Sequence, residues 1–238
     1  MILNLFQLLL ILIATFLACL TVYAVYLIDF NNNLFIHVEK IWAKVLLKIG
    51  RIKVEVEGTE NIKKNKSYIF VANHMSAFDI PVSMAYIPVS IKMIAKKELA
   101  RIPFFGWAIF LIGSIFIDRQ NREKAVKSLD KALDRIKRRN ISIMIYPEGT
   151  RSPDGEIKIF KKGAFVIAIN SGLPVVPVTI YGSRDILPKN SLRIRKGNIK
   201  MIIHEPVSSE NKTISDRGDF SRQVRDVIVN SFEKIKNT

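Results

Sequence analysis

A long apolar run opens the chain. Residues 5–28 contain no charged side chain and are mostly Leu, Ile, Val or Phe. As an α-helix this run would be about 36 Å long, enough to cross a hydrocarbon core of about 30 Å. A cleaved secretory signal would begin with basic residues, whereas the first lysine here is Lys40. We interpret the run as an uncleaved membrane anchor, which either crosses the bilayer or dips into one leaflet as half of a helical hairpin.

The next segment, residues 34–49, predicts an amphipathic helix with one apolar and one basic side. The apolar side comprises Leu34, Phe35, Val38, Ile41, Trp42, Val45, Leu46 and Ile49, and the basic side His37, Lys40, Lys44 and Lys48. Such a helix suits the surface of an anionic bilayer. A helix packed on a soluble domain would show the same pattern, so both interpretations stay open.

From residue 51 the pattern changes to short apolar runs that alternate with helical segments. Strands are expected at residues 51–57, 68–72, 114–117, 141–145, 175–180 and 200–204, and helices at 78–86, 121–139, 162–170 and 219–236. This alternation predicts an α/β fold with a mostly parallel central sheet flanked by helices, behind an N-terminal membrane-associated helical segment. We expect two parts: residues 1–50 as anchoring helices and residues 51–238 as the α/β domain.

One connection is unusually apolar. Residues 103–112 read Pro-Phe-Phe-Gly-Trp-Ala-Ile-Phe-Leu-Ile, between two predicted strands. This segment is either part of the core, a wall for a long-chain substrate, or a second contact with the membrane.

The charge balance points to a polyanionic partner. The 238 residues include 37 Lys and Arg against 21 Asp and Glu, a formal charge of +16. Asp29 is the one charged side chain in residues 1–30, so the positive-inside tendency places the rest of the chain at the cytoplasmic face of the cell membrane. One cysteine excludes an internal disulfide, and three histidines disfavour a multi-histidine metal site, so we expect no metal.

The first chemical motif follows the predicted strand 68–72. It contains His74, with Asp79 five positions later, and that pair alone is weak evidence. Its position strengthens it, because α/β folds build their sites at the carboxyl ends of strands. Asp79 is expected in the first turn of the next helix, with Ser76 as its N-cap. A carboxylate there could orient the imidazole as a base, with the substrate's own hydroxyl as nucleophile.

The second motif, residues 146–152, follows the predicted strand 141–145. Pro147 and Gly149 indicate a turn, Thr150 can donate a hydrogen bond, and Arg151 can bind phosphate through two parallel bonds. An ion pair between Glu148 and Arg151 is the structural alternative. Because both loops follow strands, one with a base and one with an anion-binding group, a shared site is the better interpretation.

These residues resemble a known family. Asn73-His74 with Asp79, and residues 147–151, look like the NHxxxxD and PEGTR signatures of the glycerolipid acyltransferases, most closely the bacterial 1-acyl-sn-glycerol-3-phosphate acyltransferases. Residues 113–119, 173–178 and 95–99 resemble further family blocks in the same order. The likeness covers roughly residues 51–182 and is loose beyond about residue 185.

The resemblance implies transfer of a fatty acyl group from acyl-CoA or acyl carrier protein to the sn-2 hydroxyl of lysophosphatidate. It makes His74 the general base and Asp79 its orienting group. Arg151, Lys96, Arg119 and Thr150 would bind the acceptor phosphate, and Asn73, Ser76, Glu148 and Gly149 would support the two loops. It requires no metal or bound cofactor, and the lipid bilayer becomes a natural partner.

Other functions are less well supported. A relative that acylates glycerol 3-phosphate or another lysophospholipid would carry the same blocks. A membrane-tethered nucleic-acid binder should interleave exposed aromatic residues with Lys and Arg, whereas most of the 14 Phe here lie in apolar runs. We therefore expect no nucleic-acid partner. A basic lipid-binding scaffold with a degenerate site fits poorly with complete motifs.

Overall fold

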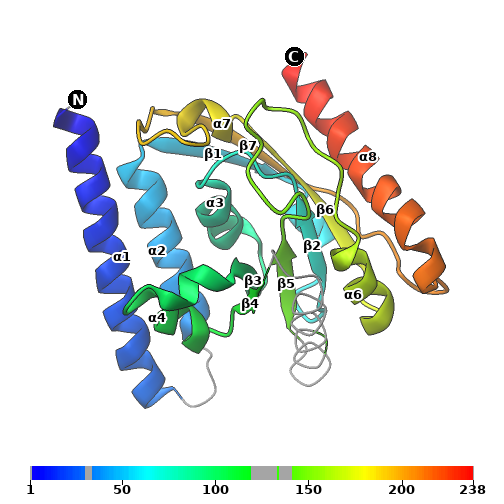
Figure 1. Cartoon of the computed structure of the whole chain (residues 1–238), viewed down its shortest axis with the longest axis horizontal. Coiled ribbons are helices and arrows are strands. Elements are labelled where there is room, and N and C mark those ends of the chain that lie inside the picture. Colours follow the sequence, from blue (N-terminus) through cyan, green and yellow to red (C-terminus); the bar gives the residue numbers. More distant parts are fainter. Residues whose placement is uncertain (1, 30–33, 119–132, 134–140, 238) are drawn as a thin grey trace.

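The protein folds around one twisted sheet (Figure 1). The computed structural model describes residues 2–29, 34–118, 133 and 141–237. Within these ranges the sheet has seven strands, in the order β1-β7-β6-β2-β5-β3-β4. They are β1 (Ile52–Glu57), β2 (Ile69–Ala72), β3 (Ile91–Lys96), β4 (Ile115–Ile117), β5 (Ser142–Ile145), β6 (Val175–Tyr181) and β7 (Gly197–Ile203). Neighbouring strands are parallel except β6 and β7, so the predicted α/β class is confirmed.

Helices cover both faces of the sheet. They are α1 (Ile2–Ile28), α2 (Phe35–Ile49), α3 (Asp79–Tyr86), α4 (Phe105–Leu111), α6 (Gly163–Ser171), α7 (Ser183–Ile186) and α8 (Arg217–Lys236). Short 3-10 turns are η1 (Thr59–Asn61), η2 (Lys97–Arg101) and η3 (Ile214–Asp216). Figure 1 shows α1 to α4 on one side and α6 with α8 on the other. The expected helix at 121–139 lies outside the described residues.

The central strands are buried on both faces. Every residue of β2 and β5 is buried, as their predominantly apolar sequences predict. One apolar cluster fills the space between the sheet and α2 and α3, and a second fills the space between the sheet and α6 and α8. This packing fixes the carboxyl ends of β2 and β5, where both motifs begin.

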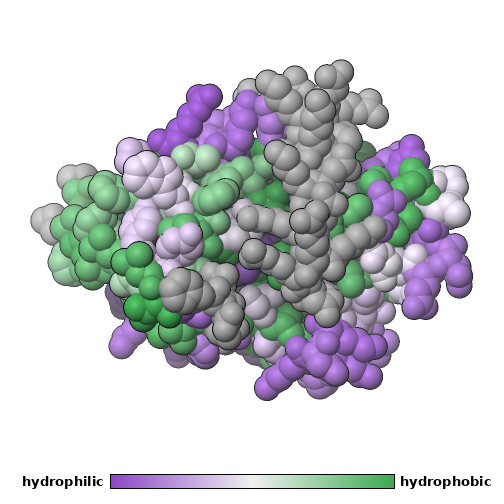
Figure 2. All heavy atoms as spheres, turned by 90° about the horizontal axis from the view of Figure 1, so that it is seen from below, coloured by the Kyte–Doolittle hydropathy of each residue, from purple (hydrophilic) through white to green (hydrophobic). Residues whose placement is uncertain are grey.

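Helix α1 lies along the domain. It is long and apolar enough to cross a membrane by length and composition, and most of its side chains face outward. Yet polar side chains join it to α2 and to the α/β domain at several levels. These bonds are Asn4 Nδ2 to Leu192 O (2.8 Å), Gln7 Nε2 to Ile49 O (3.0 Å), Trp42 Nε1 to Thr15 Oγ1 (3.2 Å) and Tyr23 Oη to Phe104 O (2.6 Å). Figure 2 shows the resulting apolar surface at the side where α1 lies.

Helix α2 packs on the α/β domain. The residues that it buries differ in part from the predicted apolar side. Its buried residues are Phe35, Glu39, Ala43, Leu46 and Leu47, whereas Ile41 and Val45 are exposed. The reason is the neighbouring helix α3, against which Ala43 and Leu47 pack in the main core. Glu39 turns inward because Lys92 of β3 faces it, with 3.4 Å between Nζ and Oε1.

The apolar connection at 103–112 contains the short helix α4. Ala108 and Ile112 are buried in a third apolar cluster with residues of α1, apart from the two main cores. In contrast, Phe104, Trp107 and Phe110 are exposed, next to the apolar surface of α1. The segment therefore divides its side chains between a small core and the surface.

Candidate active site

His74 and Asp79 meet at the carboxyl end of β2. The strand ends at Ala72, and α3 begins at Asp79, so a tight loop brings the two side chains together. The Nδ1 atom of His74 lies 2.8 Å from Oδ2 of Asp79. The Asp79 side chain is completely buried, and that of His74 is 13% exposed. One ring nitrogen is thus fixed by the carboxylate, and the imidazole remains accessible.

The Asp79 carboxylate also organises the loop around it. Its Oδ2 accepts the backbone N–H groups of Met75 (2.7 Å) and Ser76 (2.8 Å). The expectation that Ser76 is the helix N-cap is wrong, because Phe78 precedes the first helical residue and no side chain caps it. Ser76 Oγ instead donates to the carbonyl of Leu187 (2.9 Å). The serine therefore connects the loop of His74 to a distant segment of the chain.

Tyr146 holds the flat face of the histidine, and sequence reasoning missed this role. Its ring stacks on that of His74, with centroids 4.3 Å apart and planes 21° from parallel. Its hydroxyl lies 3.0 Å from Ser83 Oγ on α3. Burial raises the pKa of Tyr146 well above its ordinary value, so the phenol stays protonated. The available signal was its place directly before Pro147.

The second motif is bonded to the backbone of His74. Glu148 Oε1 accepts the N–H of His74 (2.7 Å), and its Oε2 accepts the N–H of Lys158 (3.2 Å). The N–H of Ser152 donates to the carbonyl of His74 (2.8 Å). Burial raises the pKa of Glu148, which these two bonds partly offset. Within the described ranges Glu148 and Arg151 form no ion pair, so the glutamate joins the two loops instead.

Asn73 has a structural position. Its amide donates to the carbonyl of Ile180 (2.8 Å) and accepts the N–H of the same residue (2.9 Å). The side chain is fully buried. Its two bonds extend the pairing of β2 with β6 beyond the last backbone pair, Ala72 with Val178. Such a bond keeps the loop of His74 against the sheet.

The turn at residues 149–151 faces several cations. Gly149 has φ +76°, a left-handed conformation that favours glycine, and a Cβ there would lie 2.9 Å from Lys161 Nζ. Thr150 Oγ1 accepts a hydrogen bond from Lys189 Nζ (3.1 Å). Arg151 is partly exposed. The two loops thus place a histidine and a cationic turn at the same edge of the sheet.

Lys96, another predicted phosphate-binding residue, is less constrained than the turn at residues 149–151. Lys96 ends β3, its side chain is 49% exposed, and its Nζ lies 3.6 Å from Glu98 Oε2. Its neighbour Lys97 instead pairs with Asp118, just after β4, at 2.6 Å. Because β3 is parallel to β5, Lys96 lies at the edge of the sheet that carries the site. Arg119 lies outside the described residues.

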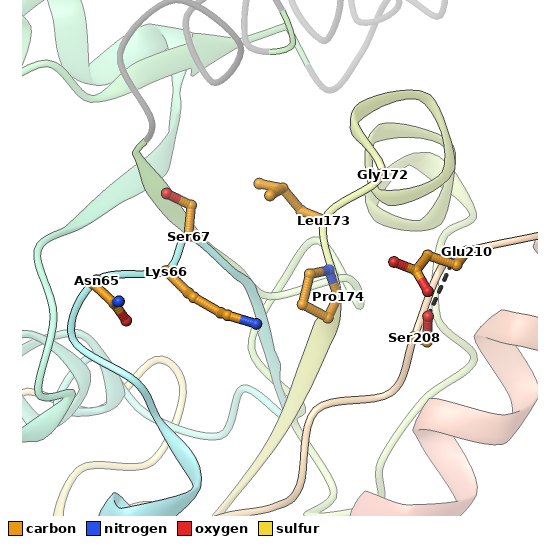
Figure 3. A pocket seen from close by; sticks show the side chains of 8 residues that line it. All are labelled: Asn65, Lys66, Ser67, Gly172, Leu173, Pro174, Ser208 and Glu210. Atoms are coloured by element: carbon orange, nitrogen blue, oxygen red, sulfur yellow. Dashed lines mark hydrogen bonds between the residues drawn. The ribbon is translucent and has the colours of Figure 1, made fainter.

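A separate pocket lies at the opposite end of the sheet. It measures about 300 Å³ and is lined by residues before β2 and β6, including Lys66 and Pro174, and by residues after β7, including Glu210 (Figure 3). The length of β2 separates it from His74, so it is not part of this site. In the part of the chain that the structure describes, no group of three or more His, Cys, Asp or Glu is arranged to hold a metal ion.

A histidine–carboxylate pair and a cationic turn at the carboxyl edge of a mostly parallel sheet suit an enzyme that transfers a group to a hydroxyl of an anionic substrate. A model of the acyltransferase family matches residues 53–181, and the chain belongs to this family. A yeast (Saccharomyces cerevisiae) 1-acyl-sn-glycerol-3-phosphate acyltransferase is 36% identical over 77% of this chain and 61% of its own length. The chain spans only 55% of a chloroplastic Arabidopsis thaliana relative of the same name.

Bacterial proteins match over more of their length. A Borreliella burgdorferi 1-acyl-sn-glycerol-3-phosphate acyltransferase is 31% identical over 81% of this chain and 77% of its own. The crystal structure of the Thermotoga maritima 1-acyl-sn-glycerophosphate acyltransferase superposes with a TM-score of 0.87 and 29% identity. That superposition covers 100% of this chain and 96% of the other. The similarity therefore includes the N-terminal helices.

Proposed function

We propose that this protein transfers a fatty acyl group from a thioester to the sn-2 hydroxyl of lysophosphatidate, forming phosphatidate. The observation that carries the proposal is the contact between His74 Nδ1 and the buried carboxylate of Asp79. Such a contact leaves the other ring nitrogen available as a base. The names of the relatives supply the substrate class.

The reaction needs one base and two substrates. His74 Nε2 removes the proton of the acceptor hydroxyl as its oxygen attacks the thioester carbonyl carbon. The carbon–sulfur bond then breaks, and the imidazolium returns the proton to the departing sulfur, which leaves as the thiol. Asp79 holds the required tautomer and stabilises the transient imidazolium. General-base catalysis of this kind contributes about 10²–10⁴ in rate.

The acceptor phosphate binds at the cationic turn. Arg151 supplies a planar guanidinium that can make two bonds to phosphate oxygens, and Thr150 adds a hydroxyl. Lys96 contributes from the end of β3, and Arg119 from the segment after β4. Glu148 and Gly149 shape the turn, and Asn73 and Ser76 hold the loop of His74. No metal or bound cofactor takes part.

The bilayer supplies the acceptor and receives the product. The apolar surface of α1 and the exposed side chains of α4 support association with a membrane, and the charge distribution supports its cytoplasmic face. The acyl donor, acyl-CoA or acyl carrier protein, is water-soluble and reaches the site from that side.

The decisive test is acyl transfer by the purified protein in vesicles. Lysophosphatidate and glycerol 3-phosphate are offered side by side, with labelled acyl-CoA and with acylated carrier protein. We expect labelled phosphatidate from the wild type and from His37→Ala, an exposed control on α2, and none from His74→Ala. Preferential acylation of glycerol 3-phosphate would show that glycerol 3-phosphate, and not lysophosphatidate, is the acceptor. Turnover of His74→Ala within threefold of wild type would refute the base.

A further inference from the structure

The loop between α7 and β7, residues 187–196, connects three parts of the molecule. The carbonyl of Leu187 accepts a hydrogen bond of 2.9 Å from the hydroxyl of Ser76, which lies two residues after His74 in the chain. Lys189 Nζ donates to Thr150 Oγ1 at 3.1 Å. Asn4, near the start of α1, bonds to the carbonyl of Leu192 at 2.8 Å and accepts the N–H of Ile194 at 2.7 Å. The loop therefore contacts both site loops and the apolar helix.

The charge of this loop is entirely positive. It contains Lys189, Arg193, Arg195 and Lys196, and no acidic residue. The ammonium group of Lys189 is held by a neutral hydroxyl, and within the described ranges it forms no ion pair with a carboxylate. A lysine nitrogen has three protons to donate, so the bond to Thr150 leaves two for another partner.

The surroundings of Lys189 do not neutralise it. Arg151 is adjacent to Thr150 in the chain, and Lys161 lies over Gly149. The nearest acidic side chains in this turn are already engaged. Glu148 is buried on two backbone N–H groups, and Asp154 accepts the hydroxyl of Ser152. Lys161 and Lys189 thus flank the turn that carries Arg151. A dianionic phosphate would stabilise this arrangement of three cations.

We infer that Lys189 is a further residue that binds the acceptor phosphate, delivered to the site by the 187–196 loop. This inference rests on the proposed function. The ammonium keeps its bond to Thr150 and directs its remaining protons to the phosphate that Arg151 also contacts. Lys189 thereby helps to select acceptors with a phosphate over neutral ones.

The attachment of the loop indicates the acceptor rather than the donor. Asn4 ties the loop to α1, whose outward face is apolar, and the side chain of Leu192 is 73% exposed. A lipid that arrives along this face meets the loop before it reaches His74. The soluble donor does not need to pass this surface.

The test compares two lysines of the same loop. Lys189→Met and the exposed control Lys196→Met remove the same charge. Lysophosphatidate is supplied in micelles of a neutral detergent, so attraction to an anionic surface plays no part. We expect Lys189→Met to raise the acceptor KM about tenfold, from the loss of one charge-assisted bond. The donor KM and the KM of Lys196→Met should stay unchanged, and Lys189→Arg should restore most of the affinity.

Three outcomes would overturn the inference. These are an unchanged acceptor KM in Lys189→Met, an increase confined to the donor KM, and equal increases in both methionine variants. Thermal unfolding of each variant shows whether it is folded, and Lys189→Gln replaces Lys189→Met if the latter is not. Failure of the wild type to acylate lysophosphatidate would reject the proposed function instead, so the two failures are distinguishable.

Discussion

Tyr146 and His74 stack in nearly parallel planes, 4.3 Å between ring centroids. The hydroxyl of Tyr146 is held by Ser83, and Ser83 lies on the same helix as Asp79. Helix α3 therefore restrains the imidazole twice, at its edge through the carboxylate and at its face through the phenol ring. An imidazole fixed in this way would lose little orientational freedom when substrate binds.

The two functions of Tyr146 can be separated by substitution. Tyr146→Phe keeps the stacked ring and loses the bond to Ser83, so stability should fall by about 1 kcal/mol while kcat changes less than about threefold. Tyr146→Leu removes the flat ring, so kcat should fall about tenfold or more as the imidazole gains freedom. Steady-state kinetics and thermal unfolding measure both. Equal losses of kcat in the two variants would show that the hydroxyl, not the ring, matters.

Asp79→Asn should lower kcat by orders of magnitude with little change in the donor KM. The amide oxygen can still accept the N–H groups of Met75 and Ser76, so the loop should persist. However, the same oxygen faces Nδ1, and a neutral amide gives the imidazolium no counter-charge and a much weaker acceptor. The exposed Asp185→Asn is the matched control. A change restricted to the donor KM would make Asp79 a binding residue.

Arg151→Lys should be damaging although the charge is kept. A guanidinium makes two parallel bonds to phosphate, whereas an ammonium is a point charge on a flexible stem. Loss of one charge-assisted bond weakens binding by about 1.5–3 kcal/mol, which predicts an acceptor KM about ten- to hundredfold higher. Arg222→Lys, exposed on α8, should behave like wild type. If only the donor KM rises, Arg151 belongs to the donor site.

The buried Glu39 should make stability depend on pH. Burial raises the pKa of Glu39 from 4.5 to about 7, against the opposing effect of Lys92. The folded protein then binds this proton more tightly than the unfolded chain, so the contribution favours folding below pH 4.5 and is lost as the pH rises toward 7. The difference amounts to at most roughly 3 kcal/mol.

Glu39→Gln isolates this contribution. Unfolding in detergent at pH 5 and pH 8 should show a smaller pH dependence in the variant than in the wild type. The comparison with wild type is needed because burial also raises the pKa of Glu148 and lowers that of His204. Both groups are present in the two proteins, so the difference in pH dependence isolates Glu39. Glu60→Gln, an exposed substitution, should keep the wild-type dependence. An unchanged slope in Glu39→Gln would contradict the assignment.

Local patterns predicted the elements whose surroundings are uniform. The runs that became β2, β5 and β6 are mostly apolar, so the local sequence agrees with their burial on both faces of the sheet. Strand β3 escaped prediction because Lys92 interrupts its apolar pattern, and this lysine is tolerated only because Glu39 faces it from a distant helix. Ile41 was predicted on the apolar side of its helix but is exposed, because packing against α3 decides which residues of α2 are buried. Tertiary partners decided both positions.

The candidate site shows a similar division. The pair of His74 and Asp79 is only five residues apart, so a motif could reveal it. The bonds from Ser76 to Leu187 and from Lys189 to Thr150 join residues 111 and 39 positions apart. A periodic pattern in the sequence cannot predict such contacts. They depend on how the chain folds back after β6, so that the 187–196 loop lies beside the loops of Ser76 and Thr150. Tyr146 was visible as an aromatic residue, but its stacking partner was not.

The bonds along α1 restrict how the protein meets a bilayer. Asn4 and Tyr23, 19 residues and about 28 Å apart along the helix, are both bonded to the α/β domain. A perpendicular crossing would carry the domain, with its lysines and arginines, into the hydrocarbon, at about 2.5–3.5 kcal/mol for each charge. If α1 enters a bilayer with these bonds intact, it would lie along one leaflet instead of crossing. A lysophospholipid would then find the site by lateral diffusion, a search in two dimensions that never requires it to leave its leaflet.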